Sequence, residues 1–156
     1  MLDNIFKFFT QADVDVCCGY AKHYLPTFKQ PEVRMMLVSY AAMEAVHQEA
    51  YSLLLETLGK SDNMYQEIFD IQAMSEKHEY LTDFNMDNPH EMAKTMAVYS
   101  GFTEGVQLFS SFAILLNFPR HNLMKGMGQI VTWSIRDETL HVEGMSQFCL
   151  LYTSPS

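Results

Sequence analysis

The sequence predicts an all-α fold, in which helices pack as a bundle around a shared core. Apolar residues recur at helical spacing through most of the 156 residues, and the alternation typical of strands is nearly absent. Apolar residues make up 48% of the chain and charged residues 19%, which favours a globular protein over a disordered one. The length suits one domain with a substantial core.

Prolines, glycines and turn-rich stretches divide the helical pattern into five segments. The first is expected to stop before Pro26, because proline interrupts a helix. The second begins at Pro31, a favourable first-turn residue, and ends at Gly59. Ser61 or Asp62 can cap the third. The predicted segments are residues 2–24, 31–59, 62–81, 89–117 and 124–148, with turn-rich sequence at 82–90 and a break at 118–122.

Charge and cysteine content exclude several classes of protein. The net charge of −9, with no basic patch, argues against a nucleic-acid-binding surface. The sequence contains neither a stretch that reads as a signal peptide nor an apolar run long enough to cross a membrane. The three cysteines form no Cys-x-x-Cys motif, and adjacent Cys17 and Cys18 cannot form an ordinary disulfide scaffold. A reducing compartment is therefore expected.

Two Glu-x-x-His motifs stand in the second and fifth segments. Glu44 precedes His47 by three residues, and Glu138 precedes His141 by the same spacing. Residues three apart share one face of a helix, so each motif presents a carboxylate and an imidazole together. Each pair is either a hydrogen-bonded core pair or half of a metal site. Two such helices, with one further carboxylate from each of two others, form the ligand set of a dinuclear iron or manganese site.

The further carboxylates come from the first and fourth segments. Glu104 lies mid-helix with apolar residues on its own face, which favours a ligand over a solvated surface residue. In the first segment, Asp13 and Asp15 lie on opposite sides of the helix, so at most one is expected to point inward. The periodicity leaves both open.

Two other residues are candidates for a role beside the metals. Tyr51 follows His47 by four residues and lies on the same stripe. A phenol beside an oxidising metal pair can lose an electron and a proton to become a radical; otherwise Tyr51 is a core residue with a hydrogen-bonded hydroxyl. Asp137, four residues before His141, either orients a ligand imidazole or pairs at the surface with Arg136.

Three sequence segments resemble those that carry the metal ligands of the small, radical-generating (β) subunit of class I ribonucleotide reductase. They are FTQADVDV, PEVRMMLVSYAAMEAVHQEAYSLLLETLG and SIRDETLH. The resemblance extends over residues 4–148, and the spacings from Asp13 to Glu44 and from Glu104 to Glu138 match the family pattern.

This resemblance implies a role for each candidate, and it selects Asp13 over Asp15. It implies one metal held by Asp13, Glu44 and His47, and a second surrounded by Glu104, Glu138 and His141, with Glu44 and Glu138 as potential bridges. Tyr51 falls on the radical tyrosine, which separates this chain from relatives that have Phe there and keep the oxidising equivalent on a manganese–iron pair. Asp137 falls on the aspartate of the radical-transfer route.

The chain also departs from the family pattern. The gap between Glu44 and Glu104 is short, and the N-terminal segment with its transfer tryptophan and the C-terminal docking tail are absent. CLLYTSPS resembles the translation of a sequencing adapter, so we expect a family domain over residues 1–148 and a non-native tail over 149–156. Such a fragment is expected to be inactive alone.

The resemblance therefore implies a ferritin-like bundle with a carboxylate-bridged dimetal core, whose cofactor is two iron ions, or manganese or a mixed pair. The site would use O₂ to form a tyrosyl radical, which the large (α) subunit uses to make deoxyribonucleotides. The implied setting is the cytoplasm of a bacterial or virus-infected cell, and the implied assembly is a homodimer. The alternatives are another ferritin-like diiron oxidase, an iron-storage protein, or a metal-free helical interaction module.

Overall fold

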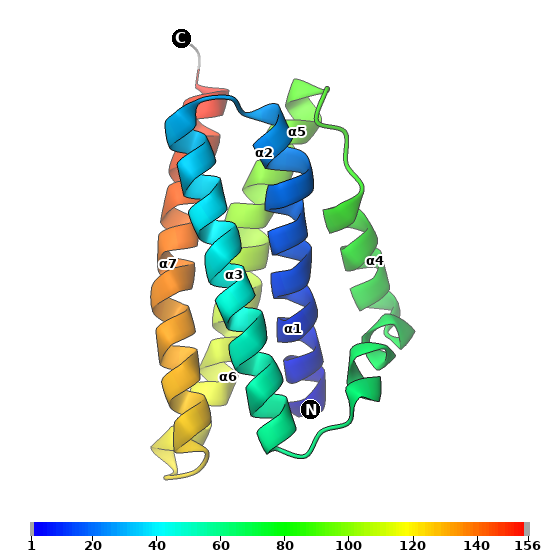
Figure 1. The fold of residues 1–156 in the computed structure, drawn as a ribbon, viewed down its shortest axis with the longest axis vertical. Coiled ribbons are helices and arrows are strands. Elements are labelled where there is room, and N and C mark those ends of the chain that lie inside the picture. The colour runs from blue at the N-terminus through cyan, green and yellow to red at the C-terminus, as the bar shows by residue number, and fades with distance from the viewer. Residues whose placement is uncertain (1, 155–156) are drawn as a thin grey trace. The chain divides into compact units, whose positions relative to one another are not determined.

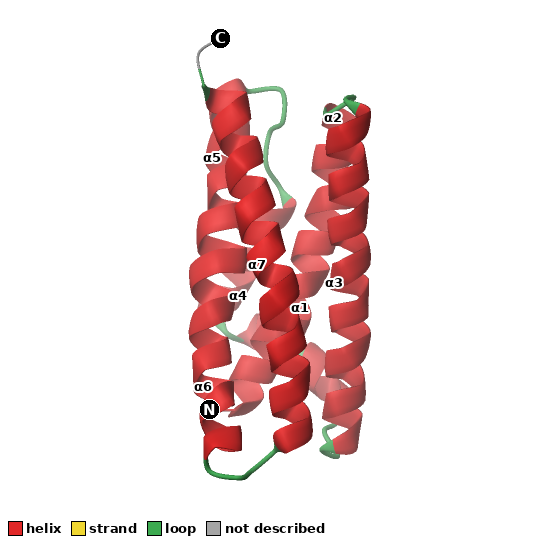
Figure 2. Cartoon of the chain, turned by 90° about the vertical axis from the view of Figure 1, so that its left-hand side faces the viewer, coloured by secondary structure: helices red, strands yellow, loops and turns green. Residues whose placement is uncertain are grey.

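The structure, a computed structural model, describes residues 2–154. Within that range every regular element is a helix, as Figure 2 shows, which confirms the predicted all-α class. No helix in the described range is both long and apolar enough to cross a membrane. The chain divides into two compact units, with the boundary between Met86 and Asp87.

The first unit opens with a long helix that passes through a proline. Helix α1 (Leu2–Gly19) continues into a π-helical turn, η1 (Tyr20–Tyr24), and then into the short α2 (Leu25–Thr27). The prediction that this helix stops before Pro26 is therefore wrong. The N–H of Leu25 donates to the carbonyl of Tyr20, five residues earlier, so the hydrogen-bond pattern has already shifted before the residue that lacks an N–H.

Helix α3 (Pro31–Thr57) runs antiparallel to α1 and lies beside it (Figure 1, blue and cyan). It begins at Pro31, as predicted, because a first-turn proline gives up no helical hydrogen bond. It ends ahead of Gly59, whose φ of +66° is a left-handed conformation that glycine adopts without strain. Apolar residues of α3 that face the first unit's core include Leu37, Leu54 and Leu55.

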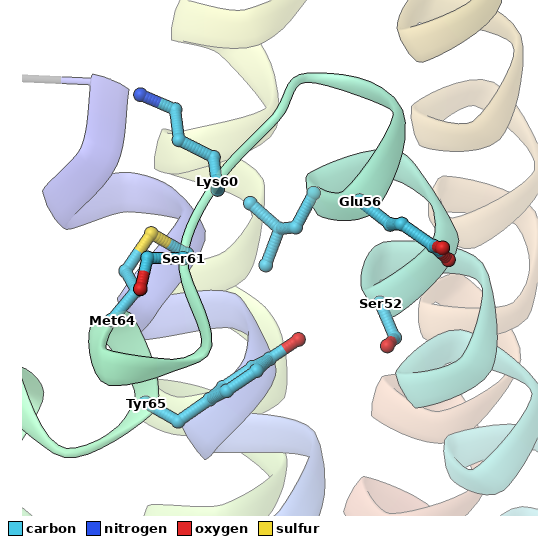
Figure 3. Close-up of a pocket in the computed structure, with 7 residues that line it drawn as sticks. Ser52, Glu56, Lys60, Ser61, Met64 and Tyr65 are labelled. Carbon is cyan, nitrogen blue, oxygen red and sulfur yellow. The ribbon is translucent and has the colours of Figure 1, made fainter.

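The third predicted segment is not one helix. It consists of two 3₁₀ turns, η2 (Asp62–Tyr65) and η3 (Glu67–Asp70), followed by α4 (Gln72–Thr82), which packs on α1. Ile71 breaks the segment because its backbone is extended. The predicted cap is Ser61, whose side chain accepts a hydrogen bond from the N–H of Asn63. Figure 3 shows the surface pocket formed where this segment leaves α3, lined by Ser52, Leu55, Glu56, Lys60, Ser61, Met64 and Tyr65.

The second unit is built on two long antiparallel stretches of helix. One contains α5 (Pro89–Ala97), the π-helical η4 (Val98–Gln107) and α6 (Leu108–Arg120); the other is α7 (Lys125–Thr153). The helix was expected to break from residue 118, but it continues to Arg120. Pro119 is tolerated because it lies in the last turn, where few hydrogen bonds remain to be lost.

Close packing joins α6 to α7 at Gly128. A Cβ atom added at Gly128 would overlap the ring of Pro119, so only glycine fits without a shift. Helix α7 extends beyond the predicted Phe148 to Thr153. The predicted non-native tail, residues 149–156, is thus partly helical, and its last two residues lie outside the described range. The origin of that tail remains a prediction.

Candidate metal centre

The first unit brings together three of the predicted ligands. Asp13 of α1 and Glu44 and His47 of α3 each offer one ligand atom, and these atoms lie within 4.8 Å of one another. All three side chains are buried, with between 1% and 4% of their surface exposed. Nδ1 of His47 lies 3.5 Å from Oε2 of Glu44, as the three-residue spacing on one helix face requires.

The second unit contains a matching cluster. Glu104 of η4 and Glu138 and His141 of α7 offer ligand atoms within 4.8 Å of one another, and none of the three is more than 1% exposed. Nδ1 of His141 lies 3.4 Å from Oε2 of Glu138 and 3.7 Å from Oε1 of Glu104. Each unit therefore completes one Glu-x-x-His motif with a carboxylate from a different helical stretch.

The position of Glu104 depends on a feature that the periodicity did not predict. It lies inside the ten-residue π-helical segment η4, where hydrogen bonds reach five residues back and the helix is wider. Single π turns occur frequently at functional sites. Gly101 and Gly105, which weaken an α-helix, are the sequence signal that marks this segment.

The donor atoms in each cluster fit iron or manganese. Carboxylate oxygens and imidazole nitrogens are the ligands that these ions accept in proteins, and the clusters contain no thiolate to favour a softer metal. Two carboxylates buried together are costly unless a cation or hydrogen bonds compensate their charge. Since both clusters are almost fully buried, metal binding accounts for them better than a solvated acidic surface would.

Tyr51 lies in the first unit, on α3, on the same side as the ligand pair. Its side chain is 2% exposed. Its ring stacks on Phe9 of α1, with the centroids 5.1 Å apart and an angle of 20° between the planes. The packing keeps the phenol in a protected, aromatic environment, which suits either a core tyrosine or a shielded redox group.

Asp137 lies at the surface side of α7, with its side chain 24% exposed. Oδ1 of Asp137 lies 3.4 Å from Nε of Arg136, which is the surface ion pair that the sequence offered as one alternative. The contact joins neighbours on one helix and leaves the predicted role of Asp137 open.

Asp15 corrects one prediction about α1. Both Asp13 and Asp15 are buried, so the expectation that at most one points inward is wrong. The reason is that α1 is covered on two sides: α3 supplies the partners of Asp13, whereas Asp15 meets α4. Oδ1 of Asp15 lies 2.7 Å from Nδ1 of His78 and accepts a 2.7 Å hydrogen bond from Gln11 Nε2. The sequence analysis did not identify His78.

An all-helical chain that buries two carboxylate–histidine clusters belongs to the class of ferritin-like bundle proteins that bind metals through Glu-x-x-His motifs. The family can be stated more closely. The model of the family "Ribonucleotide reductase, small chain" matches residues 1–154, and this chain belongs to that family.

Individual relatives agree with the family match. The chain is 50% identical, over 92% of its length, to a protein of Invertebrate iridescent virus 6 named as a probable ribonucleoside-diphosphate reductase small subunit. It is 48% identical, over 94% of its length, to a protein of the same description from Invertebrate iridescent virus 3. A small chain of Arabidopsis thaliana is 30% identical over 97% of this chain. The matches cover 44%, 43% and 44% of these relatives, so the chain spans less than half of their length.

Proposed function

We propose that this chain is the metal-binding part of a ribonucleoside-diphosphate reductase small subunit. The observation that carries the proposal is the pair of buried clusters, each of which completes a Glu-x-x-His motif with a third carboxylate. Family membership and the names of the relatives support the same reading. We infer that the two clusters provide the two halves of one dinuclear site, as the resemblance implies, with Glu44 and Glu138 as bridging ligands.

The chain's own side chains have distinct tasks in this proposal. Asp13, Glu44 and His47 hold one ion, and the second cluster holds the other. When bound, a pair of iron ions supplies the oxidising power of O₂ at the site. Tyr51 gives up one electron and its phenolic proton and becomes a neutral radical, and the stacked Phe9 excludes water from one face of the ring.

The complete protein would pass the radical to a partner. In this proposal Asp137 takes part in the route toward the large subunit, where ribonucleotides are reduced to deoxyribonucleotides. The complete small subunit would also pair with a second copy. All three cysteines are thiols, which is consistent with a reducing cytoplasm as the site of the reaction. Size measurement on a mixture of this chain and a large subunit tests the partner.

Metal analysis tests the ligands. The chain is loaded with Fe(II) without oxygen and freed of excess metal before its iron content is measured. Glu44→Ala and Glu138→Ala should each lower the iron bound per chain. Glu49→Ala and Glu143→Ala, exposed positions on the same two helices, should leave it unchanged. Equal iron content in all four variants and the parent would remove the proposed site, and measuring manganese in parallel identifies the preferred ion.

Oxygen exposure tests the role of Tyr51. Adding O₂ to the iron-loaded chain should produce an electron paramagnetic resonance signal of a tyrosyl radical, and Tyr51→Phe should abolish it without changing the iron content. Tyr40→Phe, which alters another buried tyrosine of α3, is the matched control and should retain the signal. An oxidase or a storage protein would oxidise iron equally well in both variants without a radical that depends on Tyr51.

A further inference from the structure

A buried lysine lies on the face of α1 that is turned toward α4. Nζ of Lys77 is inaccessible to solvent, although the side chain as a whole is only partly buried. Nζ lies 4.3 Å from the centroid of the Phe8 ring, within the range of a cation–π contact. Among the residues that the structure describes, none accepts a hydrogen bond from this amine. A lysine so placed is uncommon, since burial of an ammonium group is costly.

The surroundings of Lys77 contain two carboxylates. Lys77 and Asp15 line the same small pocket between α1 and α4. Burial lowers the pKa of Lys77 to about 8, and the negative charges of Asp15 and then Asp13 oppose this fall. Asp15 already has two hydrogen-bonding partners, His78 and Gln11. Asp13, in contrast, is one of the proposed metal ligands, so the charge of Lys77 acts on the first cluster.

We propose that Lys77 is a positioning residue for the metal cluster of the first unit, a built-in counter-cation that acts through Asp13 and lowers the affinity of that cluster for divalent metal. The inference rests on the proposed function, because it requires that Asp13, Glu44 and His47 bind an ion. It adds a residue of α4 that supplies no ligand atom.

Two electrostatic effects act in the same direction. In the metal-free chain, the ammonium group stabilises the neighbouring carboxylates and so favours the empty cluster. Once a divalent ion is bound, the same group repels it, and this repulsion is weakly screened because Nζ has no contact with solvent. Removing the positive charge should therefore strengthen metal binding. A purely structural role predicts the opposite, since a damaged cluster binds metal more weakly.

Titration with Mn²⁺, which stays divalent in air, tests the proposal. Binding to the full chain is followed at pH 7 by calorimetry. Lys77→Met should bind the ion at the first cluster about tenfold more tightly than the parent. Lys7→Met is the control, because Lys7 carries the same charge on α1 but pairs with Glu67 at 2.6 Å; its affinity should match that of the parent. In an Asp13→Ala background the gain from Lys77→Met should disappear.

The outcomes separate this inference from the function on which it rests. If the parent chain binds no Mn²⁺, both are overturned. If the parent binds Mn²⁺ but Lys77→Met binds it equally or more weakly, with helical content preserved in circular dichroism, the inference alone is overturned. Lys77→Gln, which keeps a polar group without the charge, replaces the Met variant if the latter loses its helical content, and the same gain is expected.

Discussion

His78 and Asp15 join α4 to α1 through a contact of 2.7 Å between Nδ1 of the imidazole and Oδ1 of the carboxylate. The carboxylate is buried, and Gln11 donates to the same oxygen. Burial raises the pKa of Asp15, while the hydrogen bonds from Gln11 and His78 oppose that rise. The contact holds α4 against α1, and it thereby sets the place of Lys77.

The first prediction concerns this contact. His78→Ala should lower the free energy of unfolding of the metal-free chain by about 2 kcal/mol, because a buried carboxylate loses one of its partners. Urea denaturation at pH 7, followed by circular dichroism, measures the change. His90→Ala, at an exposed position in the first turn of α5, should alter stability by less than about 0.5 kcal/mol. Similar losses in the two variants would show that the contact contributes little.

Two glycines at the start of α7 should respond to alanine with opposite signs. Gly128→Ala should destabilise the chain by about 1 to 3 kcal/mol, because the added methyl group overlaps the Pro119 ring. At Gly126 an added Cβ meets nothing within 4 Å, so Gly126→Ala should stabilise the helix by up to about 1 kcal/mol through propensity alone. Thermal melts of both variants decide this, and a shared sign would contradict the packing of α6 on α7.

The sequence predicted the Glu-x-x-His pairs for a simple physical reason. Glu44 with His47 and Glu138 with His141 each lie within a regular α-helix, where a spacing of three residues determines a shared face. Burial of each pair follows from the apolar residues on that face. The fold class and the start of α3 at Pro31 are local properties of the same kind, so they too could be read from the sequence.

The positions that could not be predicted depend on contacts distant in sequence or on irregular backbone. Asp13 and Asp15 are both buried because two other elements, α3 and α4, cover α1 on different sides, and periodicity within one helix contains no information about that. Glu104 lies in π-helical backbone, to which a period of 3.6 residues does not apply. Pro26 stays within its helical stretch because the turn before it is also π-helical.

Metal removal should lower stability in a ligand-dependent way. An ion that binds only the folded chain stabilises it by about 2.7 kcal/mol when its free concentration is a hundred times the dissociation constant. Mn²⁺ should therefore raise the melting temperature, and a chelator should reverse the rise. Glu138→Ala should lose part of this increase, whereas Glu143→Ala should keep it all. An increase that is unchanged in Glu138→Ala would place the ion elsewhere.

The final prediction concerns pH, and its sign follows from the lowered pKa of Lys77. The group titrates at about pH 8 in the folded chain and at its ordinary value of 10.5 in the unfolded chain. Below pH 8 both forms carry the charge, so the full cost of burying it is present. Between these values the folded chain releases the proton first, and the free energy of unfolding should rise with pH.

Comparison with Lys77→Met isolates this contribution, because the other titrating groups are common to both chains. In the presence of a chelator, the stability of Lys77→Met relative to the parent should fall by about 2 kcal/mol between pH 7 and pH 10. Urea denaturation at the two pH values measures this difference, and Lys7→Met should show no comparable change. A difference that stays constant with pH would mean that Lys77 keeps an ordinary pKa, so that its amine must reach water in solution.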